Sequence, residues 1–225
     1  MPFLVLEGLD GAGKSTQINM LSEYLAARGC KCRYIHFPRF DAPVYGELIA
    51  RFLRGELGKL SQVNPYLVAL LYAGDRAEAA DMLRSWLREG WVIADRYVYS
   101  NIGYQCAKIE DAAEREELRR WILDLEYVHN CIPKPDLSLF LDVPFAFTER
   151  RLCAARTGSD REYLKGEADI HESSLDLQRR VRQVYIDSAE KDPELRVVGC
   201  SAADGEMASP EIIFERIVSQ LVDIL

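Results

Sequence analysis

The sequence predicts an α/β protein, with a parallel sheet of about five strands and helices on both faces. Two features of the chain indicate this fold class. Short apolar runs alternate with longer amphipathic stretches, which is the order of strands and helices around a parallel sheet. A glycine-rich loop also joins the first apolar run to the first amphipathic stretch. No linker, repeat or low-complexity segment interrupts the chain, so residues 1–225 are predicted to form a single domain.

Five short apolar runs are the expected strands, at residues 3–6, 32–37, 91–95, 137–142 and 195–200. The first is continuously apolar and is bounded by Gly8, which is typical of a buried parallel strand. The second alternates in polarity and is ended by Pro38. Gly90 precedes the third strand, and two prolines interrupt the chain before the fourth.

Helices are expected between these strands. The longest begins at Asn64-Pro65, an N-cap followed by proline, and runs to about residue 88. Its buried side is predicted from leucine spacing, with Leu67, Leu70, Leu71, Leu83 and Leu87. Further helices are predicted from Ile18 to Leu25, and over residues 44–53, 114–128, 144–155, 175–189 and 210–224. A polar, glycine-containing segment at 156–170 is predicted to be a mobile surface lid.

The glycine-rich loop has the spacing G-x-x-x-x-G-K-[ST], which cradles phosphates between a strand and the N-terminus of a helix. Glycines allow left-handed backbone angles and close approach to the phosphates. Lys14 is expected to reach the β- and γ-phosphates, and the Ser15 hydroxyl to bind Mg²⁺. The residues predicted to bind ATP are Gly8, Leu9, Asp10, Gly11, Ala12, Gly13, Lys14, Ser15 and Thr16.

Composition narrows the possible partners. The chain has 28 basic and 36 acidic residues, a net charge of −8, which argues against nucleic acid or an anionic membrane as a partner. No apolar run approaches the ~20 residues of a membrane span, and no signal peptide precedes the first strand. We therefore expect a cytoplasmic protein. The six cysteines have no zinc-binding spacing and are predicted to be reduced thiols.

Other motifs separate the classes of phosphate-loop protein. The chain has no N-K-x-D guanine motif, and Val143-Pro144 follow Asp142 where a motor ATPase would carry a glutamate. A phosphotransferase needs basic groups for the acceptor phosphate and a lid that excludes water. Arg96 follows the third strand, while Arg156 and Arg161 lie on the lid segment, so the sequence favours a kinase.

Several motifs together resemble the thymidylate (dTMP) kinase family over essentially the whole chain. They are residues 7–16 (EGLDGAGKST), Phe37-Pro38-Arg39, Asp75-Arg76, Asp95-Arg96-Tyr97 with Ser100-Asn101, Pro133-Lys-Pro-Asp136 and Leu141-Asp142-Val-Pro144. The resemblance implies the P-loop kinase fold, Mg²⁺ and ATP as cofactor and phosphoryl donor, and dTMP as the acceptor that becomes dTDP. It also suggests a homodimer, for which the apolar faces of the middle helices would be suitable.

The resemblance assigns the acceptor site residue by residue. Arg96 would hold the 5′-phosphate of dTMP, and Asp95 would lie close to Mg²⁺. Asp10 would accept a hydrogen bond from the sugar 3′-OH, and Tyr104 would crowd the ribose 2′ position. The thymine ring would stack on Phe37, receive a hydrogen bond from Arg76 at a carbonyl, and be read at N3–H by Asn101.

The residues alone leave other interpretations open. Phe37 and Tyr104 fit equally well in a core, Arg76 in a surface ion pair, and Asn101 in a helix cap. Gly11 stands where some members of the family carry an arginine, which implies that the catalytic arginines of the lid, Arg156 and Arg161, replace it. Lys14 and Arg96 are the other expected catalytic residues.

Two rival functions also follow from the sequence. The first is another nucleotide or deoxynucleoside kinase; a nucleoside acceptor would need a carboxylate base, for which Glu7 is the candidate. The second is a non-catalytic nucleotide switch that binds a partner protein. A phosphate acceptor needs no general base, because its second pKa is near 6 and it is mostly dianionic at pH 7.

Overall fold

The computed structural model describes residues 1–225 except 61, 154–158, 167–168, 172–173 and 223–225; the side chains of 152–153 and 159–161 are also outside the description. Its five strands form one fully parallel sheet in the order β2-β3-β1-β4-β5. They are β1 (Phe3–Gly8), β2 (Cys32–His36), β3 (Trp91–Asp95), β4 (Leu137–Asp142) and β5 (Leu195–Gly199). The predicted five-stranded parallel sheet is confirmed.

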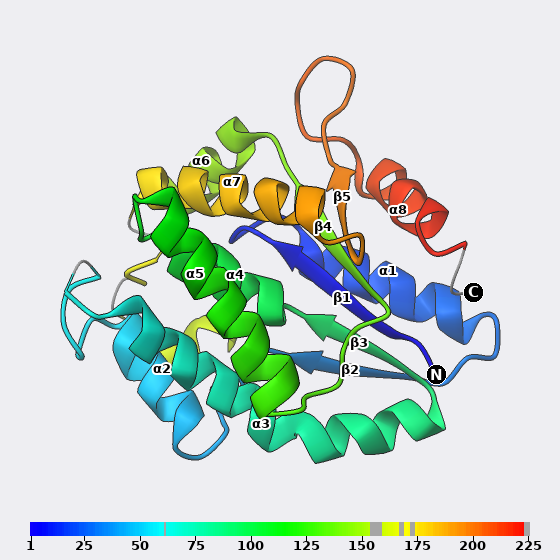
Figure 1. The fold of residues 1–225 in the computed structure, drawn as a ribbon. Helices are drawn as coiled ribbons and strands as arrows, with labels where there is room; N and C mark the ends of the chain where they lie inside the picture. The colour runs from blue at the N-terminus through cyan, green and yellow to red at the C-terminus, as the bar shows by residue number, and fades with distance from the viewer. Residues whose placement is uncertain (61, 154–158, 167–168, 172–173, 223–225) are drawn as a thin grey trace.

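Helices cover both faces of this sheet (Figure 1). They are α1 (Lys14–Ala26), α2 (Tyr45–Leu53), α3 (Pro65–Glu89), α4 (Val98–Cys106), α5 (Ala112–Leu123), α6 (Phe145–Cys153), α7 (Leu175–Lys191) and α8 (Pro210–Ser219). Helices α1 and α8 pack together on one face, while α3, α4 and α7 pack on the other and α5 lies over α4. None of the helices described is long and apolar enough to cross a membrane.

The central strand β1 contributes to a hydrophobic core on each face of the sheet. Phe3 and Val5 point into the core under α3, α4 and α7, whereas Leu4 and Leu6 point into the core under α1 and α8. All four are at most 1% exposed, as the continuous apolar run predicts for a strand buried on both sides. The same strand leads directly into the phosphate loop, so the loop rests on the most buried part of the fold.

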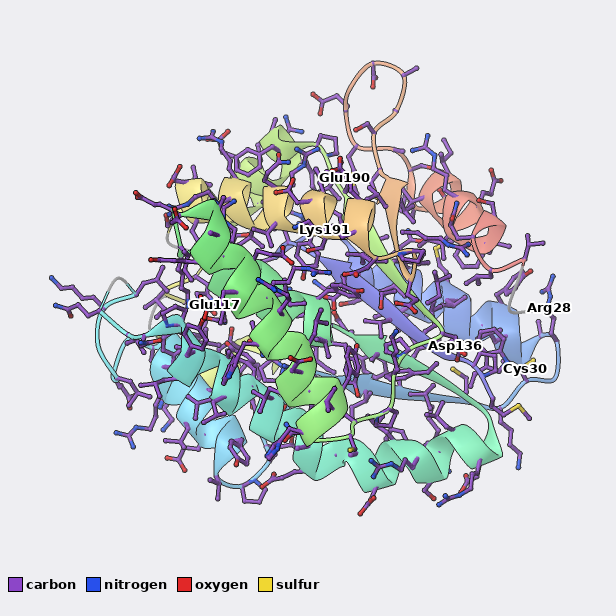
Figure 2. The ribbon with its side chains drawn as sticks, in the orientation of Figure 1. Arg28, Cys30, Glu117, Asp136, Glu190 and Lys191 are labelled. Carbon is purple, nitrogen blue, oxygen red and sulfur yellow. The ribbon has the colours of Figure 1, made fainter. Side chains whose placement is uncertain are left out.

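Asp136, which directly precedes β4, contacts the first residue of β1. Its carboxylate accepts a hydrogen bond of 2.7 Å from Phe3 N at the amino end of β1 (Figure 2). The Pro133-Lys-Pro-Asp136 motif therefore ties β1 to β4 at the end of the sheet where β1 begins. Its role in this structure is architectural.

The leucine spacing predicted the wrong side for the start of α3. Asn64 caps this helix as expected, with its side chain accepting from Tyr66 N at 2.9 Å. However, Leu67 and Leu70 are 62% and 47% exposed. The buried side of these turns carries Val68 and Ala69 instead, because the small alanine allows α3 to lie close to α4.

The prediction of one helix over 114–128 misses a change of helix type. Helix α5 ends at Leu123 and continues as a π-helix, Asp124–His129, in which Asn130 N donates to Leu125 O at 2.9 Å. This wider turn brings the side chain of Glu126 into the core with no exposed surface. Hydrophobic spacing gives no signal for the inserted turn.

Residues 100–105 belong to the buried helix α4. Within the lid segment, Ser159–Leu164 forms a 3₁₀ helix. There, the ring of Tyr163 stacks on Phe40 with ring centres 3.7 Å apart, and Leu164 is 2% exposed. The described part of the lid is therefore packed against the protein by these two apolar side chains.

Candidate active site

The carboxyl ends of β1, β2 and β3 open into one large cavity, the position where ligands bind in α/β sheets. Its volume is about 1270 Å³, larger than the usual ~300–1,000 Å³ of a pocket for one small molecule. The cavity is lined by the phosphate loop, by the segment after β2, and by side chains of α3, α4 and the lid; among them are Lys14, Ser15, Phe37, Arg76, Asp95, Arg96, Asn101, Tyr104 and Arg151.

The phosphate loop has the backbone expected of an anion cradle. Gly11 and Gly13 have left-handed φ angles of 77° and 83°, which favour glycine. Gly8 differs from these two glycines, because it ends β1 and has no positive φ angle. A Cβ on Gly8 would lie 3.2 Å from the Cβ of Ala12, so glycine is needed there for close packing. The loop leads into the N-terminus of α1, where backbone N–H groups favour anions.

Lys14 is buried at the base of this cradle with weak partners. Its Nζ lies 3.5 Å from Gly8 O, 3.4 Å from Leu9 O and 3.7 Å from Asp95 Oδ1. Burial lowers the pKa of Lys14, and the nearby Arg96 charge lowers it further. A phosphate anion in the cradle would relieve this unfavourable burial of positive charge.

Asp95 and Ser15 fit the expected magnesium site. Asp95 is 4% exposed, and its Oδ1 accepts no hydrogen bond within the described part of the chain. Ser15 is exposed and lines the cavity at the start of α1. A buried carboxylate oxygen without a donor and a hydroxyl at the phosphate loop are the hard oxygen ligands that Mg²⁺ prefers. No cluster of three His, Cys, Asp or Glu side chains suited to a metal is found among the residues described.

Arg96 is held in an unusual backbone conformation by a buried carboxylate. Its φ angle is 68°, and its N–H donates to Leu6 O at 2.9 Å. Glu7, with no exposed surface, accepts from Tyr97 N at 2.9 Å, from Ser100 N at 3.2 Å and from the Tyr185 hydroxyl at 2.9 Å. These contacts cap the N-terminus of α4 and fix the direction in which Arg96 leaves β3.

The Arg96 guanidinium reaches the loop. It donates to Asp10 Oδ1 at 2.8 Å and to Ser100 Oγ at 3.2 Å. The Tyr104 hydroxyl donates to Asp10 Oδ2 at 2.7 Å. Burial disfavours the charge of Arg96, but Tyr104 and Asp10 hold its pKa well above the ordinary value. Three residues predicted to bind the acceptor nucleotide therefore meet at one point beside the phosphate loop.

A second set of predicted residues meets deeper in the cavity, and its centre is Glu126. Arg76 donates from Nε to Glu126 Oε2 at 3.0 Å, and its Nη2 donates to Oε1. Asn101 Nδ2 donates to Glu126 Oε1 at 3.1 Å and to Ala69 O at 3.0 Å. Burial opposes the charge of Arg76, yet the Glu126 carboxylate outweighs it and raises the pKa of Arg76. The alternative interpretation of Arg76, an ion pair on the surface, is wrong, because its ion pair with Glu126 is buried.

Aromatic side chains line the rest of this inner end. Phe37 is 1% exposed, lines the cavity and packs against the ring of Tyr97, with ring centres 5.5 Å apart. Tyr104 stacks on His171 at 4.8 Å. Neutral, planar walls of this kind suit a base, whereas the charged outer end suits phosphates.

The structure does not describe the side chains of the two predicted lid arginines. Arg156 lies outside the described residues, and Arg161 lies in the 3₁₀ helix with a side chain outside the description. Arg151, at the end of α6, was missed by the sequence analysis. Its Cβ lies 3.2 Å from the position of a Cβ on Gly11, so its side chain lies over the phosphate loop. A larger residue at position 11 would meet both this contact and a left-handed backbone.

Glu126 is the other residue that the sequence analysis missed. A signal was present, because Leu118, Ile122 and Glu126 are spaced at i, i+4 and i+8, which places an acid on the apolar face of a helix. An acid at such a position is a candidate for a buried partner of a cation, and Arg76 is that partner here.

Comparisons with known proteins identify the family to which the chain is similar. A sequence model of the family described as thymidylate kinase matches residues 6–205. A probable thymidylate kinase of Thermococcus kodakarensis is 34% identical over 217 residues, covering 94% of this chain and 95% of that protein. The thymidylate kinase of Mycobacterium tuberculosis is 33% identical over 211 residues, covering 92% and 95%. A solved structure of thymidylate kinase from Candida albicans superposes with a TM-score of 0.71 at 25% identity, covering 98% of this chain and 90% of that one.

Proposed function

The chain belongs to the thymidylate kinase family, and we propose that its cavity transfers the γ-phosphoryl group of ATP to the 5′-phosphate of dTMP, giving dTDP and ADP. One observation carries the assignment of the two ends. The cavity joins an anion cradle, formed by the phosphate loop, to an inner end in which the charge of Arg76 is already compensated by Glu126. The cradle suits the triphosphate of ATP, and the compensated inner end suits an uncharged base.

Arg96 stands between the two ends and is the proposed ligand of the acceptor phosphate. Its planar guanidinium matches a phosphate in a bidentate way. In the structure its partners are Asp10 and Ser100, which keep it at the edge of the phosphate loop. The dianionic acceptor needs no proton acceptor, so positioning and charge neutralisation by Lys14 and the arginines carry the reaction.

The sugar is assigned to the Asp10–Tyr104 pair. The second Asp10 oxygen already accepts from Tyr104, which leaves the pair as a fixed polar wall beside Arg96. Asp10 accepts from the sugar 3′-OH, and the Tyr104 ring closes the space on the 2′ side. This arrangement favours a deoxyribose.

Mg²⁺ is proposed as the cofactor, held by Ser15 and Asp95. When bound, the ion neutralises charge on the β- and γ-phosphates. Asp95 Oδ1, which accepts no hydrogen bond within the described residues, and the exposed Ser15 support this assignment. Lys14 is held near Asp95 and contributes a positive charge to the cradle.

The lid arginines Arg156 and Arg161 are proposed to supply charge to the transferred phosphoryl group. Two features support this assignment. Gly11 gives the loop no basic side chain, and the lid reaches the cavity through Tyr163 and Glu162. An arginine in this role contributes about 10³ to 10⁵ in kcat.

The structure weakens the rival assignment as a deoxynucleoside kinase. A nucleoside acceptor would need a carboxylate that removes the 5′-OH proton. Glu7, the candidate, is fully buried and accepts hydrogen bonds from Tyr97, Ser100 and Tyr185, and it does not line the cavity. Its contacts fit a structural role.

The decisive experiment compares turnover of Mg-ATP by the purified enzyme with dTMP, dUMP, thymidine and no acceptor, and identifies the product. The expected result is rapid formation of dTDP and ADP from dTMP, with thymidine and the blank inactive. Phosphorylation of thymidine in place of dTMP would establish the nucleoside kinase. ATP binding without transfer to any acceptor would establish the switch.

A homodimer in the cytoplasm is the proposed state. The exposed Leu67 and Leu70 on α3 give an apolar surface that a second copy would cover. Light scattering of the wild type and of the double variant Leu67→Glu, Leu70→Glu tests this. The wild type should have the mass of a dimer and the variant that of a monomer; equal masses would remove α3 from the interface.

A further inference from the structure

The buried carboxylate of Glu126 has contacts that bear on base selection. It has no exposed surface, it belongs to a π-helix, and it touches both residues assigned to the base. A carboxylate this deep is uncommon unless it is paired, and it is paired here with Arg76. The pair alone accounts for charge compensation. The additional contact of Glu126 with Asn101 is not needed for charge compensation, and it bears on the orientation of the Asn101 amide.

The amide of Asn101 has two possible orientations, and its neighbours permit one. Nδ2 donates to Ala69 O at 3.0 Å and to Glu126 Oε1 at 3.1 Å. Both partners are acceptors, so a flipped amide would place its oxygen against two other oxygens. Asn101 Oδ1 is thereby turned away from Glu126, and it has no hydrogen-bond partner among the residues described although it is buried. Asn101 lines the cavity, which leaves this oxygen as an unused acceptor for a ligand.

Arg76 is oriented by the same carboxylate. Its Nε and Nη2 are directed to Glu126, and no hydrogen bond within the described residues uses Nη1. Arg76 also lines the cavity. Glu126 therefore leaves one donor, Arg76 Nη1, and one acceptor, Asn101 Oδ1, for the ligand.

We propose that Glu126 is a positioning residue for base selection, which fixes Asn101 and Arg76 as an acceptor–donor pair that reads a pyrimidine with N3–H and a 4-carbonyl group. This proposal rests on the proposed function and names the part of the base that the site reads. Thymine and uracil present a donor at N3 and an acceptor at position 4. Cytosine presents an acceptor at N3 and an amino donor at position 4, so both contacts would be mismatched. Sites built on such polar contacts reject the mismatched ligand strongly, because buried groups lose their partners.

The test uses two acceptors that differ only at the atoms in question. 5-Methyl-dCMP has the sugar, phosphate and 5-methyl group of dTMP, and differs at N3 and position 4. We compare kcat/KM for dTMP and 5-methyl-dCMP, with Mg-ATP, for the wild type, Glu126→Gln and Glu126→Asp. Glutamine keeps the size of the side chain but replaces one acceptor oxygen by a donor. Aspartate keeps the charge opposite Arg76 and withdraws from Asn101, so it remains informative if Glu126→Gln does not fold.

The control is Asp192→Asn, which removes a partly buried carboxylate partner of Arg119 outside the cavity. We expect this control to keep the wild-type ratio of the two kcat/KM values. In either Glu126 variant the ratio should fall by at least about tenfold, the effect of one misplaced hydrogen bond, with KM for ATP unchanged. An unchanged ratio in a folded Glu126 variant, with activity lost equally for both acceptors, would overturn the proposal and leave Glu126 a structural residue.

A measurement on the wild type needs no Glu126 variant and no turnover. The two Nδ2 protons of Asn101, assigned by comparison with Asn101→Ala, should exchange slowly with water before any nucleotide is added, because both are donated to buried acceptors. Rapid exchange in the free enzyme would overturn the proposal. If the wild type fails to phosphorylate dTMP, the proposed function fails, and this exchange measurement still reports the orientation of the amide.

Discussion

The inner and outer ends of the cavity hold their charged groups in opposite ways. At the inner end, Arg76 has a bidentate carboxylate partner in Glu126, and Asn101 is fixed by two acceptors. At the outer end, Lys14 has only contacts of 3.4 Å or longer, and Asp95 Oδ1 has no donor within the described residues. The charge of the inner end is therefore compensated without a ligand, whereas that of the outer end is not.

The difference follows from the chemistry of the two ligand parts. A base carries no charge, so a net charge at its site would be left buried without compensation; the site therefore neutralises its own arginine and exposes single hydrogen-bonding atoms. A polyphosphate brings its own negative charge, so an incomplete cationic site gains its partner on binding. Variants at the two ends should consequently affect different kinetic constants.

The largest expected effect is at the outer end. Lys14→Ala should lower kcat by about 10³ or more, because it removes the buried cation beside the transferred group. Folding should be intact, since burial already lowers the pKa of Lys14 and its charge stabilises little in the free protein. Steady-state assays measure kcat, and thermal unfolding measures the stability of the fold. Lys31→Ala, at an exposed lysine, is the matched control. Normal turnover by folded Lys14→Ala would contradict the assignment of the phosphate loop.

The next effect concerns the lid. The double variant Arg156→Ala, Arg161→Ala should lower kcat at least about a hundredfold with little change in KM for dTMP, since these side chains are assigned to the transition state. Arg150→Ala, which removes an exposed ion pair with Glu206, should have no such effect. A rate close to that of the wild type would mean that the lid only covers the site.

Arg96, at the junction of the two ends, should affect binding of the acceptor. Arg96→Ala removes a charge-assisted contact worth about 1.5–3 kcal/mol, so KM for dTMP should rise roughly 10- to 100-fold. KM for ATP should change far less. Titrations of each substrate at saturating concentrations of the other decide this, and an equal rise of both constants would place Arg96 elsewhere. Arg33→Ala, which breaks an exposed pair with Glu89, is the control.

The smallest expected effect concerns Lys108, which lacks, within the described residues, a carboxylate partner such as Glu126 provides for Arg76. Lys108 donates to Gln105 Oε1 at 2.6 Å, lies 5.0 Å from the centre of the Phe52 ring, and forms no ion pair within the described residues. Burial lowers the pKa of Lys108 to about 7. Between pH 7 and the ordinary lysine pKa near 10.4, the unfolded chain binds the extra proton, so stability should rise with pH.

Thermal unfolding of the wild type and Lys108→Met across this pH range tests the prediction. The variant should be more stable than the wild type at pH 7, and the difference should shrink as the pH approaches 10. A difference that does not depend on pH would show that Lys108 is charged in the folded protein throughout.

The sequence was most informative where chemistry depends on local spacing. The phosphate loop, the sheet and the residues that meet around Arg96 follow from short motifs and from the alternation of strands and helices. The inner end could be only partly predicted. Arg76 and Asn101 were identified. Glu126, the partner that orients them, was missed although its spacing from Ile122 places an acid on the apolar face of a helix. The π-helix that carries Glu126 leaves no mark in the hydrophobic period. The start of α3 was misjudged because alanines, rather than leucines, face the close contact with α4.

The most direct test of this account is a pair of crystal structures of the enzyme, free and with dTMP bound. The account predicts that Arg76, Glu126 and Asn101 keep their positions to within about 0.5 Å, with thymine N3 placed to donate to Asn101 Oδ1. Arg96 should move from Asp10 toward the phosphate. An inner end that rearranges on binding, with the Asn101 amide turned or the Arg76–Glu126 pair broken, would contradict the claim that these side chains are oriented before the nucleotide arrives.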